Sequence, residues 1–104
     1  MGKKSKILTS DILYEIDKLV EDIQIKSVLD QKKKIDTIFS EKIIPLLFEI
    51  KTTIEVEYFS QQDLREKINF CLASTSDIVD MDSEYAPFYS RIRVLRENIL
   101  QKII

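Results

Sequence analysis

The chain offers few side chains that could do chemistry. Among its 104 residues there is no histidine, so the commonest general base and the commonest metal ligand are both missing. It also has no glycine-rich phosphate loop, no pair of cysteines for zinc and no Glu-x-x-His motif for a di-iron centre. We therefore predict a protein that is not an enzyme, with no catalytic residue, no cofactor, no bound metal and no small-molecule substrate.

Cys71 is the one thiol of the chain. It shares the apolar side of an amphipathic segment with Leu64 and Ile68, and no histidine is present to activate it, so we expect a buried, unreactive thiol. A lone cysteine cannot form an internal disulfide, and neither a signal peptide nor a membrane-spanning run is evident. These features predict a reduced, cytoplasmic setting and no membrane span.

The acidic run from Asp80 to Glu84 has the spacing that begins a calcium-binding EF-hand loop, with carboxylates at every second residue. That loop then requires a glycine where Tyr85 stands and a glutamate where Arg91 stands, so the match fails twice. We expect these acids to cap the helix that follows instead.

Six basic residues form two groups that could contact phosphate, namely Lys32, Lys33 and Lys34 early in the chain and Arg91, Arg93 and Arg96 near its end. A nucleic-acid-binding regulator would need both groups on one face. The net charge of −2 gives no overall attraction to phosphate, and acids dominate residues 10–24. Nucleic-acid binding is therefore the alternative function, and the simpler expectation is that these charges are solvated.

The composition favours helices throughout. Apolar residues make up 44% and charged residues 33%, which is typical of an ordered globular protein. Glycine occurs only at position 2, whereas sheets joined by tight turns need residues that tolerate positive φ. We predict an all-α fold, a small bundle of about four antiparallel amphipathic helices over residues 10–104, after a flexible basic N-terminus at 1–9.

The first predicted helix covers residues 10–24, with Ser10 as its N-terminal cap. Behind this cap, apolar residues recur at steps of three and four and acids occupy the opposite side. Residues 25–31 allow two interpretations. Either a new helix begins at Ser27, or the first helix continues through Leu29.

The last two predicted helices also begin at caps. Ser60 with Asp63 resembles a capping box, which starts the third helix. Ser83 is the expected cap of the fourth helix, and this places Pro87 in the first turn, where a missing N–H does little harm.

The second predicted helix runs from about residue 31 to 58 and carries the most apolar stripe of the chain, Ile35, Ile38, Phe39, Ile43, Leu46, Leu47, Ile50 and Ile54. Pro45 lies within it and should kink or break the helix, with Ile44 ending one regular segment. If the kink lets the helix fold back, replacing Pro45 with alanine should lower stability. The alternation from Thr53 to Tyr58 is typical of a strand, but no partner strand is evident, so we expect helix there.

The second predicted helix has more apolar residues than one buried stripe requires. This surplus predicts a protein that acts by binding another protein, or first a second copy of itself as a homodimer. The residues expected to contact the partner are Ile44, Phe48, Tyr58 and Phe59. In size and helical make-up the chain is similar to small inhibitor, immunity, antitoxin and adaptor proteins, and no motif selects among them.

Overall fold

The computed structural model describes residues 6–29, 34–56 and 59–102, and the side chains of residues 10–26, 38–56 and 59–102. It contains four α-helices and one short 3₁₀ helix, in the order α1 (Lys6–Leu29), α2 (Lys34–Glu55), α3 (Gln61–Met81), η1 (Ser83–Tyr85) and α4 (Ala86–Lys102). No strand occurs in these ranges. The prediction of an all-α bundle is confirmed.

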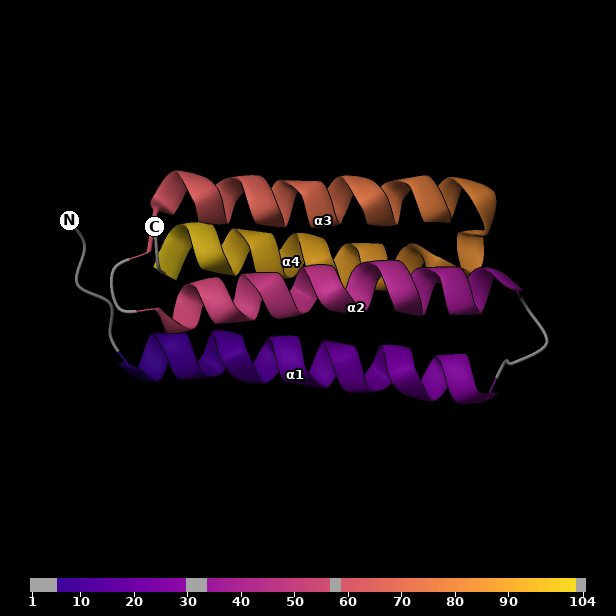
Figure 1. The fold of residues 1–104 in the computed structure, drawn as a ribbon, viewed down its shortest axis with the longest axis horizontal. Coiled ribbons are helices and arrows are strands. Elements are labelled where there is room, and N and C mark those ends of the chain that lie inside the picture. The colour runs from indigo at the N-terminus through magenta and orange to yellow at the C-terminus, as the bar shows by residue number, and fades with distance from the viewer. Residues whose placement is uncertain (1–5, 30–33, 57–58, 103–104) are drawn as a thin grey trace.

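The helices lie side by side along the long axis of a molecule that measures 46 × 21 × 17 Å. Figure 1 shows the chain reversing direction along this axis at each connection between helices. The backbones of α1 and α2, α2 and α3, α3 and α4, and α4 and α1 lie in contact. Across one diagonal of the bundle, the ring centroids of Phe39 on α2 and Phe88 on α4 lie 5.4 Å apart. Each helix therefore has two neighbours, a buried side toward the centre and an outer side toward solvent.

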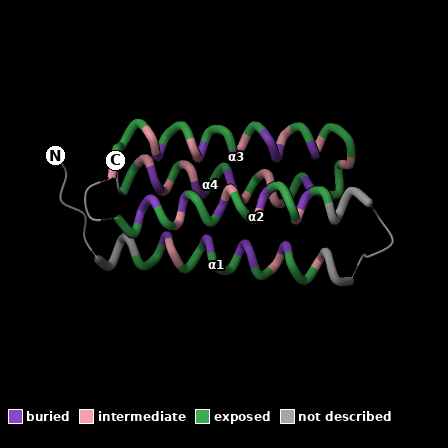
Figure 2. Tube along the Cα trace, viewed as in Figure 1, coloured by how far each residue is buried: buried purple, intermediate pink, exposed green. Residues whose placement is uncertain are grey.

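The core is built from the inward stripe of every helix (Figure 2). The buried apolar side chains are Ile12, Ile16, Leu19, Val20 and Ile23 of α1, Phe39, Ile43, Leu47, Ile50 and Ile54 of α2, Leu64, Ile68, Cys71 and Ile78 of α3, Tyr85 of η1, and Ile92, Leu95 and Ile99 of α4. Their spacing of three and four residues is the one that places side chains on a single helical face. Burial of these stripes drives the packing.

The helix starts agree with the sequence in part. Ser60 caps α3 as predicted, because its Oγ accepts a hydrogen bond from the Asp63 N–H at 3.1 Å. The predicted cap of the fourth helix at Ser83 is wrong, because Ser83 is the first residue of η1, and Asp82 caps this short helix by accepting from the Glu84 N–H at 3.0 Å. A carboxylate that carries full charge is the stronger acceptor for an N-terminal N–H. Pro87 lies in the first turn of α4, as expected.

The predicted cap at Ser10 is wrong, because α1 begins at Lys6 and Ser10 lies inside it. Residues 6–9 contain neither glycine nor proline, so nothing in them stops the helix from extending N-terminal to Ser10. At the other end α1 continues through Leu29, which decides the open question at 25–31 against a new helix at Ser27. Of the flexible N-terminus predicted at residues 1–9, residues 6–9 lie in α1, and residues 1–5 lie outside the described residues.

The predicted break at Pro45 is wrong. Pro45 lies inside α2, which is continuous from Lys34 to Glu55, and its ring is exposed. An interior proline costs about 3 kcal/mol. The buried side chains of Ile43, Leu47 and Ile50 on either side contribute about 1.5–3 kcal/mol each, so packing of both halves against one core outweighs the lost hydrogen bond. Any bend at Pro45 lies within an unbroken helix.

Thr53, Ile54 and Glu55 are helical, in agreement with the helix predicted for this segment. Thr53 and Ile54 are both buried, and the Thr53 hydroxyl donates a 2.7 Å hydrogen bond to the Glu49 carbonyl. The helix ends at Glu55, and the Val56 N–H donates to the Thr53 carbonyl at 3.3 Å. Tyr58 lies outside the described residues.

Candidate partner-binding site

Of the four residues predicted to contact a partner, Phe48 alone projects from the described surface. It keeps 43% of its surface exposed on the outer side of α2. Ile44 and Phe59 are half-buried and pack against the core, so most of their apolar surface is already covered. Tyr58 lies outside the described residues.

Eight large apolar side chains are exposed in the described part of the chain, and five of them belong to α2, its C-terminal end and α3. These five are Ile38, Phe48, Val56, Phe70 and Met81. The remaining three are spread over α1 and α4, as Tyr14, Ile25 and Val94. More of the exposed large apolar side chains therefore belong to α2, its C-terminal end and α3 than to α1 and α4.

A hydrogen bond between α2 and α3 shows which of these residues lie at the same height along the bundle axis. The Lys67 Nζ donates to Thr53 Oγ1 at 2.8 Å, and the two helices run in opposite directions (Figure 1). Ile38 precedes Thr53 by fifteen residues and Met81 follows Lys67 by fourteen, so Ile38 and Met81 lie at the same end. By the same register Phe48 and Phe70 lie near the middle, and Val56 lies toward the opposite end.

The outer stripes of both helices have the expected helical spacing. Exposed residues of α2 recur at positions 38, 41, 45, 48 and 52, and those of α3 at 66, 70, 73, 77 and 81. We call these two stripes, together with Glu49, Val56 and the side chains between them, the α2–α3 face. Sequence reasoning missed Phe70 and Met81, although both fall off the Leu64–Ile68 core stripe, and it placed Ile38 on the buried side, where the structure leaves it 41% exposed.

Acidic side chains alternate with the apolar residues of this face. Glu41, Glu49 and Asp77 are exposed and make no ion pair within the described residues. Glu66 is also exposed and accepts a hydrogen bond from Gln62 at 3.2 Å. Bases also occur on the outer side of α2 and α3, as exposed Lys42 and as Lys67, which pairs with Asp63 at 3.1 Å. Along α2 Glu41 lies between Ile38 and Phe48, and along α3 Asp77 lies between Phe70 and Met81.

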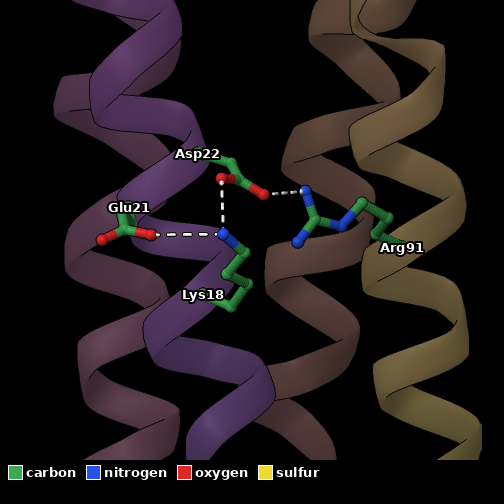
Figure 3. Close-up of polar contacts among 4 residues, drawn as sticks. All are labelled: Lys18, Glu21, Asp22 and Arg91. Carbon is green, nitrogen blue, oxygen red and sulfur yellow. Dashed lines mark hydrogen bonds and ion pairs between the residues drawn. The ribbon is translucent and has the colours of Figure 1, made fainter.

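The predicted nucleic-acid-binding arginines point to different sides of α4. Arg91 Nη1 reaches Asp22 Oδ2 of α1 at 2.8 Å, and Asp22 also lies 3.7 Å from Lys18 Nζ (Figure 3). Arg96 instead faces α3, where its Nε donates to Asn69 Oδ1 at 2.7 Å.

The remaining basic residues do not complete a phosphate site in the described chain. Arg93 is exposed, whereas Arg96 also pairs with Glu97 at 3.0 Å. Lys32 and Lys33 lie outside the described residues, and of Lys34 the structure describes the helical backbone. The arginines are thus divided between two seams of the bundle, and two of the three are neutralised by a carboxylate.

Cys71 is buried, as predicted. Burial raises the pKa of its thiol to about 12, an effect larger than the opposing influence of a hydrogen bond with Thr75. A thiol that stays protonated is a poor nucleophile and a poor metal ligand. The buried Thr75 hydroxyl donates to the Cys71 carbonyl at 2.9 Å, so its polar group is satisfied within the helix.

Three further observations concern the described residues alone. They contain no group of three or more cysteine, aspartate or glutamate side chains placed to hold a metal ion. Among them no helix combines the length and apolar character needed to cross a membrane. The acidic run after α3 has a structural role at Asp82, which caps η1.

Comparison with known proteins identifies no relative of this chain. No family model, no curated protein and no solved structure matches the chain.

Proposed function

We propose that this protein works without catalysis, by binding another protein through the α2–α3 face, as inhibitors, immunity proteins, antitoxins and adaptors do. One observation supports the proposal: five of the eight exposed large apolar side chains among the described residues belong to α2, its C-terminal end and α3. Exposed apolar surface costs free energy in water, and contiguous patches of it mark interaction sites. The buried thiol of Cys71 suits a reduced, cytoplasmic setting for this activity.

The nucleic-acid alternative has weaker support. Electrostatic binding to phosphate requires unpaired cations on a common face, and Arg91 and Arg96 are already paired with Asp22 and Glu97.

The test is capture of a protein partner by the tagged full-length chain. The variant Phe48→Ser/Phe70→Ser removes the two central apolar side chains, and Tyr14→Ser/Val94→Ser removes two equally exposed ones on α1 and α4. Circular dichroism melts first establish that both variants fold. We expect the wild-type chain and the control to retain the same partner, and the face variant to lose at least tenfold in affinity.

Retention of that partner by the face variant, or equal loss in the control, would refute the proposal. Size-exclusion chromatography with light scattering on the same three proteins measures whether a second copy occupies the face.

A further inference from the structure

We infer that the seam between α3 and α4 receives an acidic helix of a protein partner, whose carboxylates pair with Arg65 and Arg93. This seam is a second surface, separate from the α2–α3 face. Arginines from both helices converge on it, next to a hydrogen bond that fixes how the two helices are aligned.

The hydrogen bond from Arg96 Nε to Asn69 Oδ1, at 2.7 Å, sets this alignment. The helices run in opposite directions (Figure 1). Arg65 precedes Asn69 by four residues and Arg93 precedes Arg96 by three, so each shares a helical side with a member of the bonded pair. Because the helices are antiparallel, Arg65 and Arg93 lie on either side of the bond, with their Cα atoms about 10 Å apart along the bundle axis.

Half-buried leucines lie beside the two arginines. Leu72 follows Asn69 by three residues and is therefore level with Arg93, whereas Leu100 follows Arg96 by four and is level with Arg65. A helix laid along the shallow seam between two packed helices can contact such side chains. The seam thus offers apolar contact between its charges.

The seam is positive, although the whole chain carries a net charge of −2. Arg65 and Arg93 are exposed and make no ion pair within the described residues. Arg96 is already paired with Glu97 at 3.0 Å. Glu66, the acid next to Arg65 in the sequence, belongs to the outer stripe of α3 on the α2–α3 face. Two unpaired cations therefore remain on the seam, and they select an anionic partner.

The spacing of these cations matches an acidic helix. Side chains seven residues apart on one helix share a face and lie about 10 Å apart along its axis. An arginine pairs with a carboxylate through two parallel hydrogen bonds. A partner helix with Asp or Glu at positions i and i+7 can therefore pair with Arg65 and Arg93 together, and it leaves the Arg96–Glu97 pair intact.

Nucleic acid suits the seam less well. Its affinity for a protein depends on the release of counterions from several phosphates, and two unpaired arginines neutralise too few of them.

The experiment uses the isotope-labelled full-length chain and two synthetic helical peptides of about 18 residues. Both peptides have one composition, with two glutamates each. The first places them at i and i+7, on one face, and the second at i and i+5, on nearly opposite faces. We expect the first peptide to bind about fivefold more tightly and to shift the NMR signals of the Arg65 and Arg93 Nε–H groups. Equal affinities, or no binding of the first peptide, would overturn the inference.

Charge-reversal variants locate the binding surface, after circular dichroism has established that they fold. Arg65→Glu and Arg93→Glu should each weaken binding of the first peptide about tenfold, and a peptide with one glutamate replaced by lysine should recover binding to them. The control Lys42→Glu makes the same change of charge at an exposed residue of α2 and should leave the affinity within about twofold. An equal loss in this control would show attraction to net charge alone and would refute the inference.

Other occupants of the seam give different results. If a single-stranded DNA oligonucleotide binds more tightly than the first peptide and Arg93→Glu abolishes that binding, the occupant is nucleic acid and the inference is wrong. Self-association in light scattering that Arg93→Glu abolishes would assign the seam to a second copy, with the same consequence. Phe48→Ser/Phe70→Ser leaves both arginines in place and should bind the peptide as the wild-type chain does, so the two surfaces are tested separately.

Discussion

Arg91 of α4 and Asp22 of α1 form an ion pair at 2.8 Å, although 69 residues separate them in the sequence. The contact joins the last helix to the first. The same carboxylate lies 3.7 Å from Lys18 Nζ, so it contacts two cations.

A double-mutant cycle on Arg91→Ala and Asp22→Ala should give a small coupling energy of about 1 kcal/mol or less, because both side chains remain about one-third exposed. Urea unfolding of the four proteins measures it, and 1 M salt should reduce it. Arg93→Ala is the control, and we expect a change in unfolding free energy within about 0.5 kcal/mol. A coupling energy of zero at low salt would contradict this role.

Pro45→Ala should raise the melting temperature. The helix is continuous through this position and the ring is exposed, so alanine restores a backbone N–H without disturbing the core. The gain can reach about 3 kcal/mol, the difference in helix propensity between the two residues. Differential scanning calorimetry measures it. A lower melting temperature would mean that packing on both sides of Pro45 depends on a bend there.

Tyr85→Phe should leave the protein equally stable or stabilise it by about 1 kcal/mol. The Tyr85 ring is buried, 4.4 Å from that of Phe39, and its hydroxyl finds no hydrogen-bond partner in the described part of the chain. Removing an unsatisfied buried hydroxyl removes its desolvation penalty. Tyr14→Phe, on the exposed side of α1, is the matched control. A clear loss of stability in Tyr85→Phe alone would show that the hydroxyl is satisfied in solution.

Alkaline pH should destabilise the protein partly through Cys71. Burial raises the pKa of this thiol from 9.0 to about 12 in the folded chain. Above pH 9 the unfolded chain therefore releases a proton that the folded chain retains, and the free energy of unfolding falls as pH rises toward 12. The contribution is about 1.4 kcal/mol per pH unit at most.

Urea unfolding of the wild-type chain and Cys71→Ala from pH 8 to pH 11 isolates this effect, since lysine and tyrosine titrations are common to both proteins. The alanine variant should be less stable at pH 8, because it leaves a cavity, but should lose less stability with rising pH. Parallel curves for the two proteins would contradict the assignment.

The sequence by itself determined the features that arise within a helical turn or from residue type alone. The near absence of glycine and the apolar residues at steps of three and four specify four helices, because these properties act locally. The cap at Ser60 was predictable for the same reason, since its hydroxyl reaches an N–H only three residues away. The burial of Cys71 also follows from its place on an apolar stripe.

Only the tertiary structure decided which apolar residues of α2 are buried and which are exposed. Ile38 and Phe39 are adjacent and both apolar, yet Phe39 is buried and Ile38 is exposed, because the positions of α1 and α3 select which side faces the core. Phe70 and Met81 are exposed for the same reason. The sequence gives their hydrophobicity, and the register between α2 and α3 sets Met81 level with Ile38 and Phe70 level with Phe48 along the bundle axis.

The three arginines of α4 and Pro45 show the same difference between what the sequence indicates locally and what the tertiary structure decides. Along the chain, one basic group contains Arg91, Arg93 and Arg96. In the folded protein, helical rotation directs Arg91 toward Asp22 and Arg96 toward Asn69. Pro45 carries a local penalty that favours a break, and burial of side chains on both sides of it outweighs that penalty. Local propensity is a property of a few neighbouring residues, whereas partners and burial depend on the whole arrangement of helices.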